Sequence, residues 1–292
     1  MKPISIIEAT LVSENYYSGV SGMAEALRKV GLSKRLKAKT TARLPLPDWQ
    51  AKRDPETQII NPEEVRDYTV KIADAVEKDI VDGFFPLVVG GDCTILLGCL
   101  LALKRQGRSG LFFLDGHADF YQPGVSPSGE TADMELRLAI GRGPEIVTNP
   151  EGKMPLVQES DVVLFGFRDE TMIKEAGGED VRGTGISCFS LHDIQLIGFS
   201  NAVERGIEKL LSRVDNFWIH LDVDVLEDAV MPAVDYRMSG GLSLGELVSV
   251  LQRLVKTGKA LGMCVTIFNP TLDWDGSLAK KLVDVLGTAL TN

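Results

Sequence analysis

Short apolar runs alternate with longer amphipathic segments along most of this chain. The apolar runs consist of valine, leucine, isoleucine and phenylalanine with almost no polar interruption, which is typical of strands buried on both faces of a sheet. The six predicted strands are Ile4–Ala9, which is the weakest, Pro86–Val89, Leu111–Leu114, Val162–Phe165, Phe217–Leu221 and Gly262–Ile267.

The segments between these runs carry apolar residues at helical spacing. In the clearest one, Leu247, Val250, Leu251 and Leu254 form a single stripe, as expected of a helix with one buried face. Because strands and helices alternate, the sequence predicts an α/β fold with a mostly parallel sheet. No repeat or linker divides the chain, so we expect residues 1–292 to form a single domain. The six predicted helices are Gly22–Val30, Pro62–Asp82, Ile95–Gln106, Ala202–Val214, Leu244–Lys256 and Leu278–Leu290.

Composition and charge exclude several classes of function. An apolar content of 44% supports a large core and argues against disorder. The net charge of −10 argues against nucleic acid as a partner, and it would suit a cationic substrate. We expect a cytoplasmic protein without a membrane partner, because the sequence has neither a bilayer-length apolar stretch nor a signal segment. The scattered cysteines Cys93, Cys99, Cys188 and Cys264 make a disulfide framework improbable.

Three of the predicted strands end in residues that can bind metals. The second is followed by Gly-Gly-Asp-Cys at 90–93, the third by Asp-Gly-His-Ala-Asp at 115–119 and the fifth by Asp-Val-Asp at 222–224. Ligands of parallel sheets bind beyond the carboxyl ends of the strands, and buried carboxylates are costly unless paired or bound to a cation. A single aspartate here could instead cap a helix or form a turn. Five such groups at two strand ends together favour a site for two divalent metals.

In order and spacing, these motifs resemble the arginase–agmatinase–formiminoglutamase family, the ureohydrolases. The resemblance implies a three-layer α/β/α sandwich with a binuclear Mn²⁺ site, usually assembled as a homo-oligomer, either a trimer or a hexamer. The matching segments are Gly90–Asp92, Asp115–Asp119, Ser128-Gly129, Gly166–Asp169, Leu221–Asp224, Gly240–Leu242 with Glu246, and Asn269-Pro270.

The resemblance also implies a role for each metal-binding residue. Asp115 and Asp222 would bridge the two metals, His117 and Asp224 would bind one of them, and Asp119 would bind the other. A hydroxide between the metals would attack the amidine carbon of a guanidino or formimino group, with Asp119 accepting its hydrogen bond. The tetrahedral intermediate would then expel an amine, so the family implies a hydrolase of non-peptide C–N bonds in linear amidines.

Cys93 departs from the family, which usually has a histidine at this position. A thiolate is a softer ligand than an imidazole. Cys93 could bind metal and shift the preference toward Zn²⁺, Fe²⁺ or Co²⁺, it could leave a weakened site, or the site could be lost. A buried residue at a helix start, without a role in metal binding, is an equally weighted alternative.

Further departures concern the substrate. Ile267 stands where arginases and agmatinases have the glutamate that binds the guanidinium group, and Thr171 replaces a second aspartate of the amino-acid pocket. Glu130 and Ala132 stand where the family often has an asparagine and a proton-shuttling histidine. These changes make classical arginase specificity doubtful.

The predicted contacts to a guanidino or amidino substrate come from Ser128, Glu130 and Asp169. Glu130 would add an anionic contact to a cationic substrate, whereas a solvated loop residue is the slightly favoured alternative. His220 should share a side of its strand with Asp222, either behind the metals or, as we prefer, as a hydrogen-bonded core histidine.

A second class of function remains open. The changes at Cys93, Ala132 and Ile267 would also fit a catalytically inactive family member that binds a small molecule or serves as a scaffold. The four carboxylates among these five groups would repel one another in one pocket without a cation, which favours the hydrolase. A dinucleotide-binding enzyme has little support because the glycines at 90–91 do not form a Gly-x-Gly-x-x-Gly turn.

Overall fold

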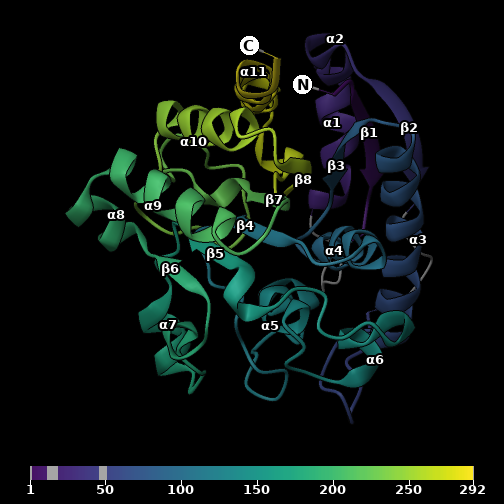
Figure 1. The fold of residues 1–292 in the computed structure, drawn as a ribbon, viewed down its shortest axis with the longest axis vertical. Coiled ribbons are helices and arrows are strands. Elements are labelled where there is room, and N and C mark those ends of the chain that lie inside the picture. Colours follow the sequence, from purple (N-terminus) through teal and green to yellow (C-terminus); the bar gives the residue numbers. More distant parts are fainter. Residues whose placement is uncertain (1, 12–18, 46–50, 292) are drawn as a thin grey trace.

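The computed structural model describes residues 2–11, 19–45 and 51–291, and its centre is an eight-stranded, all-parallel sheet. The strand order is β2-β1-β3-β8-β7-β4-β5-β6. β8, from the end of the chain, lies between β3 and β7, so both halves of the sequence share one sheet (Figure 1). The strands are β1 (Ile4–Ala9), β2 (Lys39–Leu44), β3 (Phe85–Gly90), β4 (Gly110–Leu114), β5 (Val162–Phe165), β6 (Ser187–Phe189), β7 (Phe217–Asp222) and β8 (Ala260–Thr266).

All six predicted strands are confirmed, and the sequence pattern missed only the two edge strands, β2 and β6. β2 alternates between exposed and half-buried residues, because nothing covers an edge strand completely. β6 has only three residues. Neither strand could therefore show the continuous apolar run that marks a strand buried on both faces.

Helices cover both faces of the sheet and confirm the three-layer α/β/α prediction (Figure 1). Apolar residues of α1, α2, α9, α10 and α11 form one core with one face of the sheet, and those of α3 to α6 form a second core with the other face. In β4, Phe112 enters the first core and Phe113 the second, as the alternation of side chains along a strand requires.

The α-helices have the following bounds: α1 (Met23–Lys29), α2 (Leu32–Leu36), α3 (Pro62–Val81), α4 (Ile95–Gln106), α5 (Glu135–Ala139), α6 (Glu145–Thr148), α7 (Glu170–Glu175), α8 (Leu191–Ile197), α9 (Phe199–Leu211), α10 (Leu244–Lys256) and α11 (Ser277–Thr291). Short 3₁₀ helices lie at Gly19–Gly22, Thr131–Asp133, Pro150–Gly152, Glu159–Asp161, Val181–Gly183, Val223–Val225 and Pro270–Leu272. The six predicted helices correspond to α1, α3, α4, α9, α10 and α11. Within the described ranges, no helix is both long and apolar enough to cross a membrane.

α10 shows how the sequence fixes a helix of this fold. Ser243 and Glu246 form a capping box, in which the Ser243 hydroxyl accepts the Glu246 N–H at 3.2 Å and the Glu246 carboxylate accepts the Ser243 N–H at 2.8 Å. The stripe predicted from Leu247 to Leu254 is fully buried, and burial of each leucine contributes about 1.5–3 kcal/mol.

The sheet brings the carboxyl ends of β3, β8, β7 and β4 side by side. The segments that follow β3, β4 and β7 therefore meet at one edge of the sheet, as the sequence predicts. The stretches Tyr121–Thr131 and Glu227–Gly241 contain almost no regular structure, and parts of both lie over this edge, where they contribute to the cavity described below.

Candidate metal centre

The acidic motifs after β4 and β7 interlock through their backbones. The Gly116 N–H donates to Asp224 Oδ1 at 2.9 Å, the His117 N–H to Asp115 Oδ1 at 2.6 Å, and the Asp224 N–H to Asp222 Oδ1 at 2.7 Å. A Cβ atom on Gly116 would lie 2.8 Å from Asp224 Oδ1, so only glycine permits this approach. The two strand ends therefore hold their carboxylates in a fixed arrangement.

His117 and Asp224 form the closest ion pair of the site. The His117 Nδ1 atom lies 2.8 Å from Asp224 Oδ2. Although burial alone would lower it, the Asp224 carboxylate raises the pKa of His117 to about 9. His117 in turn keeps the pKa of Asp224 below its ordinary value against the effect of burial. In the metal-free protein, protonated His117 therefore neutralises the negative charge of Asp224.

The remaining carboxyl groups of the cluster lack such a partner. Burial, followed by the neighbouring acids, raises the pKa of Asp115, Asp119 and Asp222 well above the ordinary range. For Asp119 the largest contribution after burial comes from Glu135. Several acids that resist ionisation in one place mark a position where a cation would be strongly favoured.

Cys93 lies inside this cluster. Its Sγ atom is 2.9 Å from Asp222 Oδ2 and 3.1 Å from Thr266 Oγ1, and the residue is fully buried just before α4. Burial, with a further contribution from Asp222, raises the pKa of the thiol well above its ordinary value. The protonated thiol donates a hydrogen bond to the Asp222 carboxylate.

Three groups of side chains have the spacing needed to hold a metal, and Asp115 belongs to all of them. Within each group the possible ligand atoms lie within 4.8 Å of one another. The groups are Asp115, His117 and Asp119; Asp115, Asp222 and Asp224; and Cys93, Asp115, Glu135 and His220. The structure thus brings together all six residues that the sequence predicts as metal ligands.

Buried polar atoms without partners support a cation at this place. Among the described residues, Asp115 Oδ2, His117 Nε2, both Glu135 carboxylate oxygens and His220 Nε2 have no hydrogen-bond partner. Such atoms are rare in folded proteins and call for a ligand, an ion or water. The oxygen-rich donor set fits Mn²⁺ or another divalent metal, so the residues present fit the binuclear centre that the resemblance implies.

Glu135 and His220 are the two site residues that the sequence did not identify as candidate ligands. Glu135 begins the five-residue helix α5, where a glutamate normally stabilises the helix N-terminus in solvent. His220 meets our expectation of a core histidine only in part. Its Nδ1 atom lies 3.2 Å from Cys264 Sγ, but its Nε2 atom faces Asp115 Oδ2 at 3.6 Å. The alternation of side chains along β7 places His220 on the same side as Asp222, and this is the only feature of the sequence that indicates its position in the site.

A small cavity of about 130 Å³ opens beside the cluster. All three residues predicted to contact substrate, Ser128, Glu130 and Asp169, line it. The other lining residues are Asp92, His117, Asp119, Tyr121, Pro127, Ala132, Asp133, Met172, Asp222, Asp224, Tyr236 and Ile267. Thr171 lines a different, neighbouring pocket.

Glu130 is only 5% exposed, so the slightly favoured alternative of a solvated loop residue is wrong. The Tyr236 hydroxyl donates to Glu130 Oε2 at 3.1 Å, and the Glu130 N–H donates to Ser128 Oγ at 3.0 Å. Ser128 Oγ also donates to Asp133 Oδ2 at 2.5 Å. These contacts hold an anionic group at the cavity wall.

Backbone strain concentrates at the same cavity. Seven described non-glycine residues have positive φ, and three of them, Asp119 (φ 45°), Tyr236 (φ 44°) and Ile267 (φ 70°), line it. For β-branched Ile267 this conformation is a true outlier. Each such residue costs of order 1–3 kcal/mol, which the surrounding packing offsets. Strain of this kind is found preferentially at functional sites.

Comparisons with known proteins agree with the fold and the motifs. The family model described as "Arginase family" matches residues 3–290. An arginase of Staphylococcus aureus (strain MSSA476) is 30% identical over 296 residues, covering 98% of this chain and 96% of the relative. The solved structure of the Bacillus caldovelox arginase is 27% identical with a TM-score of 0.88, covering 100% and 99% of the two chains. The Bacillus cereus arginase structure, at 26% identity, has a TM-score of 0.87 and the same coverage.

Proposed function

This chain belongs to the arginase family, and from that premise we propose that it is a metal-dependent hydrolase of a linear guanidino or amidino compound. The single observation that carries the proposal is the convergence of buried carboxylate and imidazole groups around the end of β4, several of whose atoms have no hydrogen-bond partner among the described residues. A protein that had lost its catalytic role would have no reason to keep so many unfavourable charges together.

Six residues would hold the metals in this proposal: Cys93, Asp115, His117, Asp119, Asp222 and Asp224. Asp115 belongs to every ligand group of the cluster, which suits a residue that bridges two ions. We propose two ions per chain, with Mn²⁺ the first choice for the positions rich in oxygen ligands. When bound, two divalent ions would supply the acidity that makes water a nucleophile at neutral pH and would stabilise negative charge that develops on the substrate.

The protein's own groups would handle the substrate and the protons. Asp119 lines the cavity beside the cluster, where it would accept a hydrogen bond from the attacking water and orient it toward the amidine carbon. The water oxygen would bond to that carbon, the C–N bond would break, and the proton taken from water would pass to the departing amine nitrogen. Asp119 is the proposed carrier of this proton.

Glu130 and Asp169 would bind the cationic parts of the substrate. Both are buried at the cavity wall, and among the described residues Asp169 Oδ1 has no hydrogen-bond partner. Ile267 cannot pair with a guanidinium group, so the contacts differ from those of arginases. The cavity is also smaller than the roughly 300–1,000 Å³ of pockets for drug-sized ligands, which favours a small, linear substrate.

Two further features of the proposal concern the state of the protein. By resemblance we propose a homo-oligomer, either a trimer or a hexamer. The four free cysteines in the described structure suit a reducing compartment, and we propose the cytoplasm.

The test is a screen of small guanidino and formimino compounds for release of amine by the metal-loaded protein, with Asp119→Asn in parallel. We expect turnover of at least one compound by the natural chain. General acid–base catalysis contributes about 10²–10⁴-fold, so Asp119→Asn should lose at least about a hundredfold in kcat. Turnover that persists unchanged in the variant would contradict the proposed role of Asp119, and a metal-loaded protein without turnover would favour the binding or scaffold alternative.

A further inference from the structure

We propose that Cys93, Asp115, Glu135 and His220 form a four-ligand metal position that prefers Zn²⁺, Fe²⁺ or Co²⁺ to Mn²⁺. The inference rests on the proposed function only in placing this ion beside Asp115, within the same centre. It adds Glu135 and His220 to the ligand set that the resemblance implies. It also makes the two metal positions of the centre chemically different.

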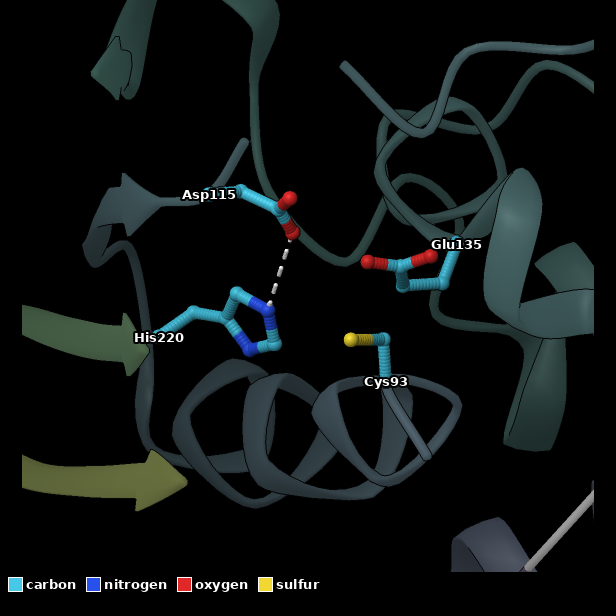
Figure 2. Close-up of side chains that lie close together, drawn as sticks. All are labelled: Cys93, Asp115, Glu135 and His220. Atoms are coloured by element: carbon cyan, nitrogen blue, oxygen red, sulfur yellow. Dashed lines mark ion pairs between the residues drawn. The ribbon is translucent and has the colours of Figure 1, made fainter. Parts of the chain in front are cut away.

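The geometry of the four side chains is that of a shared ligand site. Their possible ligand atoms all lie within 4.8 Å of one another, and Figure 2 shows the four side chains pointing toward a common space. They come from four different elements: the turn before α4, the end of β4, the start of α5 and the middle of β7. Such convergence of distant segments on one point is what a metal site requires.

Partnerless atoms within this group point to a missing ligand. Glu135, Asp115 and His220 are each 0% exposed. Among the described residues, no hydrogen bond of ordinary geometry reaches either Glu135 oxygen, Asp115 Oδ2 or His220 Nε2, and the last two atoms lie 3.6 Å apart as a long ion pair. The Asp119 carboxyl group interacts with Glu135 and brings no positive charge to it, and the interaction adds to the effect of burial in raising the pKa of Asp119. An uncompensated buried carboxylate of this kind is expected only where a proton or a cation neutralises it.

His220 is held so that its Nε2 atom faces the group. Its ring stacks on Phe113 with 4.4 Å between the ring centroids, and its Nδ1 atom lies 3.2 Å from Cys264 Sγ. The same sulfur accepts the Trp218 indole N–H at 3.3 Å. If the sulfur also accepts the Nδ1 proton, the free electron pair lies on Nε2. Metal-binding histidines are usually oriented in this way through their second nitrogen.

The chemistry of the donors distinguishes this position from its neighbour. One thiolate, one imidazole and two carboxylates suit a four-coordinate, borderline-soft metal. The neighbouring residues Asp222, Asp224 and His117 offer mainly oxygen, which suits Mn²⁺. The Cys93 thiol donates a hydrogen bond to Asp222 Oδ2, and binding of a metal to the thiolate would displace that proton. With the histidine that the family usually has at position 93, both metal positions would have only nitrogen and oxygen donors.

The test uses Co²⁺ as a spectroscopic probe, because a thiolate bound to Co²⁺ gives a charge-transfer band in the near ultraviolet. We expect this band in the natural chain and its loss in Cys93→Ser, whereas Cys188→Ser, a matched cysteine variant outside the site, should keep it. In Glu135→Gln and His220→Asn, Co²⁺ affinity should fall at least about tenfold, with little change in Mn²⁺ bound at the neighbouring position.

X-ray absorption of the Zn²⁺-loaded natural chain tests the same ligand set without a substitution, so its result does not depend on whether a variant folds. We expect one sulfur neighbour at about 2.3 Å and nitrogen or oxygen neighbours at about 2.0–2.1 Å. Absence of a sulfur neighbour, or a Co²⁺ spectrum and affinity unchanged in Glu135→Gln and His220→Asn, would overturn the inference. A centre that contains sulfur but turns over no substrate would contradict only the proposed function, whereas turnover with two Mn²⁺ ions and no sulfur ligand would contradict only this inference.

Discussion

The hydroxyl group of Tyr236 donates a hydrogen bond of 3.1 Å to the Glu130 carboxylate, joining two loops that lie 106 residues apart in the sequence. Each residue belongs to one of the two irregular stretches of the chain, and both line the cavity beside the candidate metal centre. The bond fixes an anionic group where the family often has an asparagine. We therefore regard Glu130 as the main determinant of substrate charge.

Replacement of Glu130 by glutamine should raise KM for a cationic substrate with a smaller effect on kcat. A hydrogen bond to a charged group contributes about 1.5–3 kcal/mol, so the increase in KM should be roughly 10- to 150-fold. Tyr236→Phe should cause a smaller increase, because the carboxylate remains. Steady-state kinetics measure both effects. Glu64→Gln, at an exposed position of α3, is the matched control, and a KM for Glu130→Gln equal to that of this control would refute the assignment.

Metal should stabilise the protein more as pH rises. In the metal-free chain, burial and neighbouring acids hold the pKa values of Asp115, Asp119, Asp222 and Glu135 well above their ordinary values of 3.8 and 4.5. A raised pKa means that the folded state binds these protons more tightly than the unfolded state does. These four groups therefore favour the folded, metal-free protein most at low pH, and they progressively destabilise it as pH rises above the ordinary pKa values.

Thermal unfolding with and without metal, between about pH 5 and pH 8, measures this dependence. Metal present at about 100 times its dissociation constant should add about 2.7 kcal/mol, which corresponds to an increase in Tm of roughly 4–5 °C for a chain of 292 residues. At one fixed metal concentration, the increase should be larger at pH 8 than at pH 5, because fewer protons compete for the ligands and the dissociation constant is lower. An increase that shrinks with rising pH would show that these carboxylates are not the ligands.

Two substitutions in and before α10 test the account of the fold independently of the metal. Leu251→Ala removes a fully buried side chain and should cost about 2–5 kcal/mol of unfolding free energy. Ser243→Ala removes one half of the capping box and should cost about 1 kcal/mol. Denaturant unfolding of both variants gives the two values. Equal losses, or a larger loss for Ser243→Ala, would contradict the observed burial.

The sequence predicted the parts of this molecule in which local pattern and final environment agree. Leu111–Leu114 reads as a buried strand because both of its faces are covered, and the motif after it lies at the sheet edge because parallel strands end together. β2 escaped detection because an edge strand is only partly buried. The short helix α5 has no room for a periodic stripe.

Convergence of distant residues was harder to predict than the motifs themselves. Glu135 lies 42 positions after Cys93 and His220 a further 85 positions on, and no local pattern relates them. Glu135 looks like an ordinary residue at a helix start, and His220 like a core residue of β7. Only the packing of α5 and β7 around the end of β4 places their unpartnered atoms beside Asp115.

The most direct test of the account is the metal content per chain. The protein is equilibrated with Mn²⁺ alone, with Zn²⁺, Fe²⁺, Co²⁺ or Ni²⁺ alone, and with Mn²⁺ together with one of these ions. Free metal is then removed, and the bound metal is determined by elemental analysis. We predict about two equivalents in total when Mn²⁺ is combined with one of the softer ions, as a binuclear centre requires. Absence of bound metal under all of these conditions would contradict both the metal centre and the proposed hydrolase function.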